Sequence, residues 1–313
     1  MDSNGRELTR REAMERKRLY IASLMIFIGI PVVIALGVLV LPKELYMLLS
    51  IVVLCMTMAP FFMVFESRKP KAREIVLLAM VSALTAGAHI FLHIVLPVQI
   101  GTALVIIGGI SLGPEAGFLI GALSRFVCNF YMGQGPWTPW QMFCWGLLGF
   151  LAGLAFNRGN MDSLKSRSFK VIVGPVLTIA FALLVAYASY MIYPGEDESF
   201  FGWRLYAFGA VGLIAGVVVQ KKRLPIDGLT ISLFTFFTSF IIYGGIMNAA
   251  SLIMTMNANT GETLSLDALR ALYISGLPYD MLHAGTAAIC VFLFGESIIT
   301  KLERIKIKYG IYK

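Results

Sequence analysis

A charged side chain lies inside one of the apolar stretches of this sequence. Arg125 stands near the middle of the stretch that begins at Ala116, and Asn129 follows one helical turn later. An arginine at mid-bilayer costs about 2.5–3.5 kcal/mol on insertion scales, so it faces other protein groups and needs an acceptor. Asp280 or Glu296 could supply that acceptor. A structural ion pair and a contact to a ligand are both open.

Four further polar groups lie within apolar stretches near the C-terminal end. Tyr243 opens the motif YGGIMN and Asn248 closes it, and the two glycines between them loosen a helix or admit a close neighbour. Asp280 and His283 share a helix face just after the sequence Gly-Leu-Pro at 276–278, where we expect a helix break. Polar groups inside membrane helices are candidates for function by default, and we expect these side chains to line a cavity.

The most informative stretch is GQGPWTPWQMFCWGLLGFLAG, which begins at residue 133. A turn rich in Gly and Pro leads into a helix start that carries Trp137, Trp140 and Trp145. Trp137, Trp140 and Gln141 are spaced to share one helix face. They fit an aromatic belt at the membrane surface. They also fit the wall of a ligand site in which Gln134 and Gln141 supply amide groups, and both interpretations stay open.

The residues give little support for an enzyme. His89 and His93 have the spacing of a metal pair, but no third ligand and no general base accompany them, which favours ordinary polar groups near a helix end. The sequence has no P-loop and no nucleophile elbow. Its four cysteines all lie in apolar stretches without a metal-binding spacing. We expect no catalytic residues, no metal and no cofactor.

Composition shows which elements must position these groups. Hydrophobic residues make up 58% of the 313 residues and charged residues 14%, against about 45–50% and about 25% in soluble domains. This composition excludes a soluble enzyme, a disordered chain and a secreted disulfide scaffold. It indicates an all-α, polytopic bundle of membrane helices in the lipid bilayer. The formal charge of +8 requires no nucleic-acid partner, since excess Lys and Arg is typical of cytoplasmic loops.

Stretches long enough to cross a bilayer predict ten spans. They are 19–41, 45–65, 75–96, 100–112, 116–132, 137–156, 171–193, 203–219, 226–254 and 278–300. The fourth is short for a membrane, so it is tilted, partial or buried in protein. An amphipathic or re-entrant helix is expected at 266–275.

The basic residues predict the orientation of these spans. With ten spans and a cytoplasmic N-terminus, 22 of the 26 Lys and Arg residues fall on the cytoplasmic side. The basic segments at 1–18 and 301–313 then become cytoplasmic tails, and both termini lie in the cytoplasm. The linker at 66–74 separates an N-terminal hairpin, 19–65, from a membrane domain at 75–300.

Small residues recur every four positions at Ala79, Ala83 and Gly87. Such a stripe lets two membrane helices approach closely. It is explained either by packing within the bundle or by docking onto another membrane subunit.

Several motifs together resemble the S components of energy-coupling factor (ECF) transporters, which capture vitamins. They are AMVSALTAG, LSRFVCNFYMGQGPWTPWQMFCWGLLGFLAGL, YGGIMN and GLPYDMLHAGTAAICVFLFGESIITKLERIKIKYG. The resemblance extends from about residue 74 to the C-terminus, and GQGPWTPWQM is typical of a subset of these proteins.

The resemblance implies a core of six helices that binds a micronutrient near the extracellular side of a prokaryotic plasma membrane. It also implies docking, through an Ala-xxx-Ala motif matched by Ala79 and Ala83, on a T component and two ATPase subunits. The S component would then topple in the membrane to carry its ligand inward. The motif subset suggests cobalamin or a related precursor as ligand.

The chain departs from this pattern by about four additional helices. They are the N-terminal hairpin and a pair apparently inserted at about 171–219, whose roles the sequence leaves open. The position of Arg125 is also unusual. The alternative functions are a self-sufficient, ion-coupled secondary transporter and, with less support, a membrane-integral enzyme. The former would need carboxylates deep in the bundle, and only Asp280 and Glu296 come near that requirement.

Overall fold

The chain is helical throughout the part that can be described. The computed structural model describes residues 72–95, 97–135, 137–156, 169–193, 200–219, 226–258 and 266–311, with scattered positions between 20 and 56. These ranges contain helices and no strand, which confirms the all-α class. The predicted tail at 1–18 and, apart from the scattered positions, the predicted hairpin at 19–65 lie outside the described residues.

The described helices correspond to the last eight predicted spans. They are α4 Ala72–Val95, α5 Ile100–Leu112, α6 Pro114–Met132, α7 Thr138–Phe156, α8 Phe169–Ile192, α9 Trp203–Val219, α10 Gly228–Phe237, the π-helical segment η4 Thr238–Gly244, α11 Gly245–Ala258 and α12 Leu266–Tyr309. The stretch from α10 through η4 to α11 is one continuous helix, because α11 begins directly where η4 ends.

The helices are those of a polytopic membrane protein. Within the described ranges, α4, α7, the α10–α11 stretch and α12 are long and apolar enough to cross a membrane. The helix α5 has 13 residues, and every residue from Gly101 to Leu112 is buried. Of the possibilities left open for this short helix, burial in protein is the one observed.

One expectation is wrong at α12. The sequence at 276–278 predicted a break that would separate an amphipathic segment from the last span, yet α12 runs unbroken for 44 residues with Pro278 inside it. Neighbouring groups can compensate for a proline in a membrane helix. Gly276 does not end the helix. It lies against α11, where a Cβ on residue 276 would be 2.5 Å from Asn248 Oδ1. This glycine allows two helices to approach closely.

The antiparallel helices α6 and α7 touch backbone to backbone. A Cβ on Gly149 of α7 would overlap the carbonyl oxygen of Gly117 on α6, and a Cβ on Gly153 would overlap the backbone of Pro114. Both pairs advance by about four residues along each helix, which keeps them on one face. Membrane helices use small residues in this way to bring their backbones together.

Beyond these glycines, the contacting faces of α6 and α7 carry the polar residues Arg125 and Gln141. One turn beyond Gly117, a Cβ on Gly121 would overlap the backbone of Trp145. One turn beyond that, Arg125 of α6 meets Gln141 of α7, with its Nε 2.9 Å from Oε1. The glycine contacts therefore fix the separation at which these two side chains meet.

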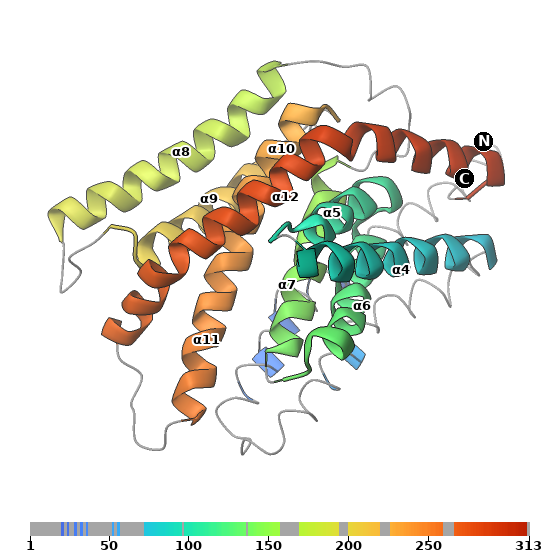
Figure 1. The fold of residues 1–313 in the computed structure, drawn as a ribbon. Coiled ribbons are helices and arrows are strands. Elements are labelled where there is room, and N and C mark those ends of the chain that lie inside the picture. The colour runs from blue at the N-terminus through green and yellow to red at the C-terminus, as the bar shows by residue number, and fades with distance from the viewer. Residues whose placement is uncertain are drawn as a thin grey trace.

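The helix α5 completes this three-helix unit. A Cβ on Gly109 would overlap the carbonyl oxygen of Gly149, and Gly117 also approaches Gly109 closely. Figure 1 shows α4 to α7 gathered on one side of the molecule, with α12 extending from the α8–α9 side towards the start of α4. Thus α12 crosses most of the labelled helices in this view.

The helices α8 and α9, the pair predicted to be inserted, pack on each other and on η4. A Cβ on Gly212 of α9 would lie 2.6 Å from Cβ of Ala182 on α8. A Cβ on Gly209 would lie 2.9 Å from the Ile241 side chain. The contact between Gly209 of α9 and Ile241 of η4 attaches the pair to the buried part of the bundle.

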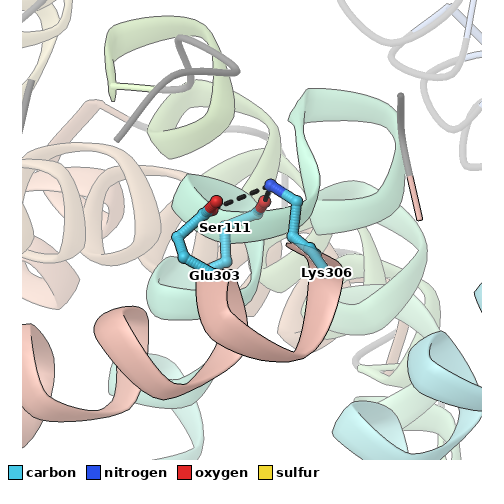
Figure 2. A network of polar contacts seen from close by, with 3 residues as sticks. All are labelled: Ser111, Glu303 and Lys306. Atoms are coloured by element: carbon cyan, nitrogen blue, oxygen red, sulfur yellow. Dashed lines mark hydrogen bonds and ion pairs between the residues drawn. The ribbon is translucent and has the colours of Figure 1, made fainter. Parts of the chain in front are cut away.

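The last turns of α12 hold the opposite end of the bundle together. Lys306 is 7% exposed, and its ammonium donates to the backbone carbonyl of Ser111 and to Glu303 Oε1, 2.8 Å away. Figure 2 shows this contact. A cation at a helix C-terminus satisfies free carbonyls there and complements the helix dipole. Close by in sequence, Tyr309 accepts through its carbonyl from Arg73 at the start of α4, at 3.4 Å.

The glycine contact between α6 and α7 predicts the effect of one added methyl group. Gly149→Ala places a Cβ against the backbone of α6, which cannot rotate away, so we expect a loss of about 1–3 kcal/mol of stability, as for overpacked cores. Thermal unfolding of the purified protein measures it. Gly285→Ala on α12 is the matched control, because a Cβ there meets nothing within 4 Å. Equal stability of the two variants would contradict the close contact.

Candidate functional site

Arg125 lies at the centre of a buried polar cluster. Its side chain is 8% exposed, and its Nη1 donates to His89 Nε2 of α4 at 3.2 Å, in addition to the bond from Nε to Gln141. The guanidinium carbon also lies 5.2 Å from the ring centroid of Trp145, a cation–π distance. Three helices, α4, α6 and α7, thus surround one charge.

A chain of hydrogen bonds continues from this cluster to the loop before α7. Asn129 Nδ2 donates to Gln141 Oε1 at 2.9 Å and to Thr138 Oγ1 at 3.0 Å. The Thr138 hydroxyl in turn donates to Gln134 Oε1 at 2.9 Å and accepts from the backbone N–H of Gly135 at 3.2 Å. The predicted amide groups Asn129, Gln134 and Gln141 therefore form one network with Arg125.

Several buried polar atoms near this network have no hydrogen-bond partner among the described residues. They are Nδ1 of His89, His93 and His283, Oδ1 of Asn129 and Nε1 of Trp145. Buried polar groups in folded proteins are nearly always hydrogen-bonded, and exceptions indicate a water, an ion or a ligand. This group of atoms around one charge is available to hydrogen-bond a bound molecule.

His283 approaches the cluster from α12. Its Nε2 lies 2.9 Å from Thr102 Oγ1 of α5, and its ring centroid is 4.3 Å from that of Tyr243 in η4. Thr102 follows Gly101, where a Cβ would overlap Trp145 and lie 2.9 Å from His89. The two groups predicted from separate sequence motifs, around Arg125 and around His283, therefore meet at the start of α5.

Asp280 belongs to a second polar group. Its Oδ2 accepts from Tyr206 of α9 and from Asn248 of α11, both at 2.8 Å. The carboxylate also lies against Gly244, where a Cβ would be 2.7 Å from Oδ2. The motif YGGIMN therefore needs a glycine at this position because a carboxylate occupies the space beside it.

The expectation that Asp280 or Glu296 accepts a hydrogen bond from Arg125 is wrong. Asp280 is bound by Tyr206 and Asn248, and Glu296 Oε1 accepts from the backbone N–H of Gly228 at the start of α10. A carboxylate at a helix N-terminus is stabilised there by the helix dipole. Among the described residues, Arg125 is bound by an amide, an imidazole and an indole, and no carboxylate pairs with it.

The π-helical segment η4 places Tyr243 in this site. Segments of this kind are rare and are frequent at functional sites, because the extra residue in the turn shifts side chains out of regular register. Every residue of η4 is buried. Tyr273 of α12 donates through its hydroxyl to the carbonyl of Gly245 at 2.7 Å, which satisfies a backbone group next to the irregular turn.

The tryptophans predicted as ligand contacts take different places. Trp137 is 40% exposed and its ring covers Gly135, where a Cβ would lie 2.5 Å away. Trp140 is partly buried and packs against the hydrophobic core. Their contact with a ligand stays a prediction. Trp145, by contrast, is fully buried beside Arg125.

Sequence reasoning did not include Trp145, His89 and Tyr206 among the binding residues. Trp145 follows Gln141 by four residues and so shares its face, a signal that was present in the spacing. His89 was considered only as half of a metal pair; its Nε2 contacts Arg125, and the described ranges hold no group of three metal-binding side chains. Tyr206 had no local signal, because α9 meets Asp280 only in the folded bundle.

Comparisons with known proteins give one match. Residues 69–202 match the family model described as ECF-type riboflavin transporter, S component. The matched range contains α4 to α8 and includes Arg125 and the loop before α7. No curated protein and no solved structure matches the chain.

The network predicts a test of the loop before α7. Thr138→Val keeps the side-chain shape but removes the hydroxyl that serves Asn129, Gln134 and Gly135, so we expect a loss of about 1–3 kcal/mol of stability, the cost of unsatisfied buried groups. Thermal unfolding measures it. Thr300→Val is the control, since the hydroxyl of Thr300 bonds only within its own helix, to Glu296 O. The role of Thr138 fails if both variants unfold alike.

Proposed function

We propose that the chain is an S component of an ECF-type transporter, as the match of residues 69–202 to that family model supports, and that it captures a vitamin-like small molecule for import. The molecule enters from the extracellular side and binds among α4, α6, α7, η4 and α12. A T component and two ATPase subunits then supply the energy. The protein resides in the plasma membrane of a prokaryote.

The single observation that carries this proposal is the buried polar cluster around Arg125. Its guanidinium, the amide of Asn129 and the rings of His89, Trp145 and His283 come together from four helices, and four of these residues keep a buried polar atom unpartnered among the described residues. These atoms are available to form hydrogen bonds with a captured molecule.

The Asp280 group supports a second side of the same site. Asp280 and His283 stand one turn apart on α12, and Tyr243 packs on His283 while Gly244 packs on Asp280. We propose that Asn248 and Asp280 bind the far end of the ligand. The helix pair α8–α9 contributes to this side, because Tyr206 of α9 holds the Asp280 carboxylate.

The orientation follows from the ends of the helices. Arg73 at the start of α4 contacts Tyr309 at the end of α12, so the start of α4 and the basic last turns of α12 lie at the same end of the bundle. Basic segments favour the cytoplasmic side. Arg125, Asn129 and the loop before α7 then lie in the extracellular half, since α6 runs from the cytoplasmic end to Met132.

One face of α4 supports docking. Ala79, Ala83 and Gly87 are all exposed, and a Cβ on Gly87 would meet nothing within 4 Å. Exposed Met80 and Leu84 continue this apolar face. Among the described residues nothing covers this stripe, and we propose that it contacts the T component.

Two ligand classes are candidates. The description of the matched family model supports a flavin, whose planar ring suits the aromatic groups of the site. The motif GQGPWTPWQM supports cobalamin or a related precursor. Binding of riboflavin and of cobalamin to the purified chain, followed by tryptophan fluorescence, distinguishes the two.

Reconstitution tests the division of labour. The chain alone in liposomes should bind its ligand and transport none of it, because we assign ATP hydrolysis to the partner subunits. Uptake should begin when the T component and the ATPase subunits are added with ATP. Uptake by the isolated chain driven by a proton or sodium gradient would replace this proposal with a secondary transporter.

The docking face predicts the effect of a bulky residue. Ala79→Trp should abolish co-purification with the T component and leave ligand binding unchanged, since Ala79 is exposed on α4 and lies ten residues before His89. Ile289→Trp is the control, an exposed position on α12. Assembly that survives Ala79→Trp would show that α4 docks elsewhere or not at all.

A further inference from the structure

The charge on Arg125 is hydrogen-bonded but not neutralised. Gln141 Oε1, His89 Nε2 and the Trp145 ring contact the guanidinium, and all three groups are neutral acceptors or π systems. Among the described residues no carboxylate forms an ion pair with Arg125, and Asp280 and Glu296 have other partners. A buried charge in a membrane protein is ordinarily paired.

The neighbours of Arg125 add donors. A guanidinium has only donors, so His89 Nε2 must carry a lone pair and His89 must hold its proton on Nδ1. That Nδ1–H is buried and has no partner among the described residues, and the same holds for Nε1–H of Trp145. The two rings pack edge to face with centroids 4.9 Å apart.

The cluster thus combines one full positive charge with two neighbouring N–H groups that lack acceptors. The guanidinium is complementary to an anion, because a charge-assisted hydrogen bond to a carboxylate or a phosphate cancels its charge, and the N–H groups around it supply further donors to the ligand. A neutral carbonyl would satisfy the donors and leave the charge. Cancellation matters most here, since the surroundings are buried and the dielectric constant is low.

We propose that the molecule captured by this protein carries an acidic group, a carboxylate or a phosphate, and that this group binds beside Arg125, His89 and Trp145. The proposal rests on the proposed capture function and defines its substrate class. Asn129 Oδ1, a buried acceptor without a partner among the described residues, then receives a hydrogen bond from an N–H or O–H elsewhere on the ligand. The ligand combines an acid with a nearby donor.

Matched pairs of small molecules test this substrate class. The full chain in lipid nanodiscs at neutral pH is titrated with riboflavin and its 5′-phosphate, nicotinamide and nicotinate, biotin amide and biotin, and pantothenol and pantothenate. We expect the acid of at least one pair to bind tenfold or more tightly than its neutral counterpart. Arg125→Gln should remove that preference, and Arg125→Lys should retain part of it.

Arg204→Gln is the matched control. Arg204 lies on α9 and bonds to the carbonyl of Tyr193, outside the site, so its loss should leave the preference for the acid unchanged. If Arg204→Gln lowers acid binding as much as Arg125→Gln does, the preference arises from general attraction of anions and the proposal is wrong.

The outcomes separate this proposal from the capture function. Tight binding of a neutral member, or of cobalamin, with an affinity that Arg125→Gln leaves unchanged, would keep the capture function and overturn the anionic class. Binding of no compound in the panel would count against both.

A second variant places a negative charge beside Arg125 within the protein itself. Gln141→Glu places a carboxylate 2.9 Å from Arg125 Nε, where the amide oxygen now lies. We expect a higher unfolding temperature for the empty protein and at least a tenfold loss of affinity for the acidic ligand, because the internal carboxylate competes with it. Unchanged affinity for the acid would contradict the proposed pairing.

Discussion

The backbone contact between α6 and α7 is the constraint on which the rest of the structure depends. Two helices can lie this close only where neither carries a side chain, and Gly117, Gly121 and Gly149 provide that surface. Van der Waals packing over such a surface holds helices together in a medium where the hydrophobic effect gives no drive for association. The distance between the two helices that these glycines set also determines how Arg125 of α6 meets Gln141 of α7.

The contact also explains how a charge can be buried in so apolar a chain. Close backbones leave long side chains at the end of the glycine surface to meet directly, so Arg125 reaches Gln141 and the ring of Trp145 without a gap. Helix α5 packs against the side chains of Trp145 and His89. A Cβ on Gly101 of α5 would overlap Trp145 and lie 2.9 Å from His89. Small residues on three helices thus create the space that one arginine and two rings fill.

Much of this arrangement could be predicted from the sequence, for reasons that are local. The apolar runs define membrane helices, and the polar residues within or beside them pointed to Asn129, Gln134 and Gln141 as candidate groups of a site. The partner of Arg125 could not be predicted, because charge alone suggested Asp280 or Glu296, and each of those is held by a group that no local pattern connects to it. The continuity of α12 was missed because Gly276 and Pro278 look like a helix end, although the glycine is required by the neighbouring Asn248.

Helix α12 connects two ends of the molecule that are otherwise far apart. It carries Asp280 and His283 beside the binding groups and Lys306 beneath the last turn of α5, a separation of about 39 Å along a helix that rises 1.5 Å per residue. Both attachments are buried, and the helix between them has no break. A reorientation of the protein in the bilayer would therefore move α12 as a rigid body, and the end at Lys306 would tilt together with Asp280 and His283.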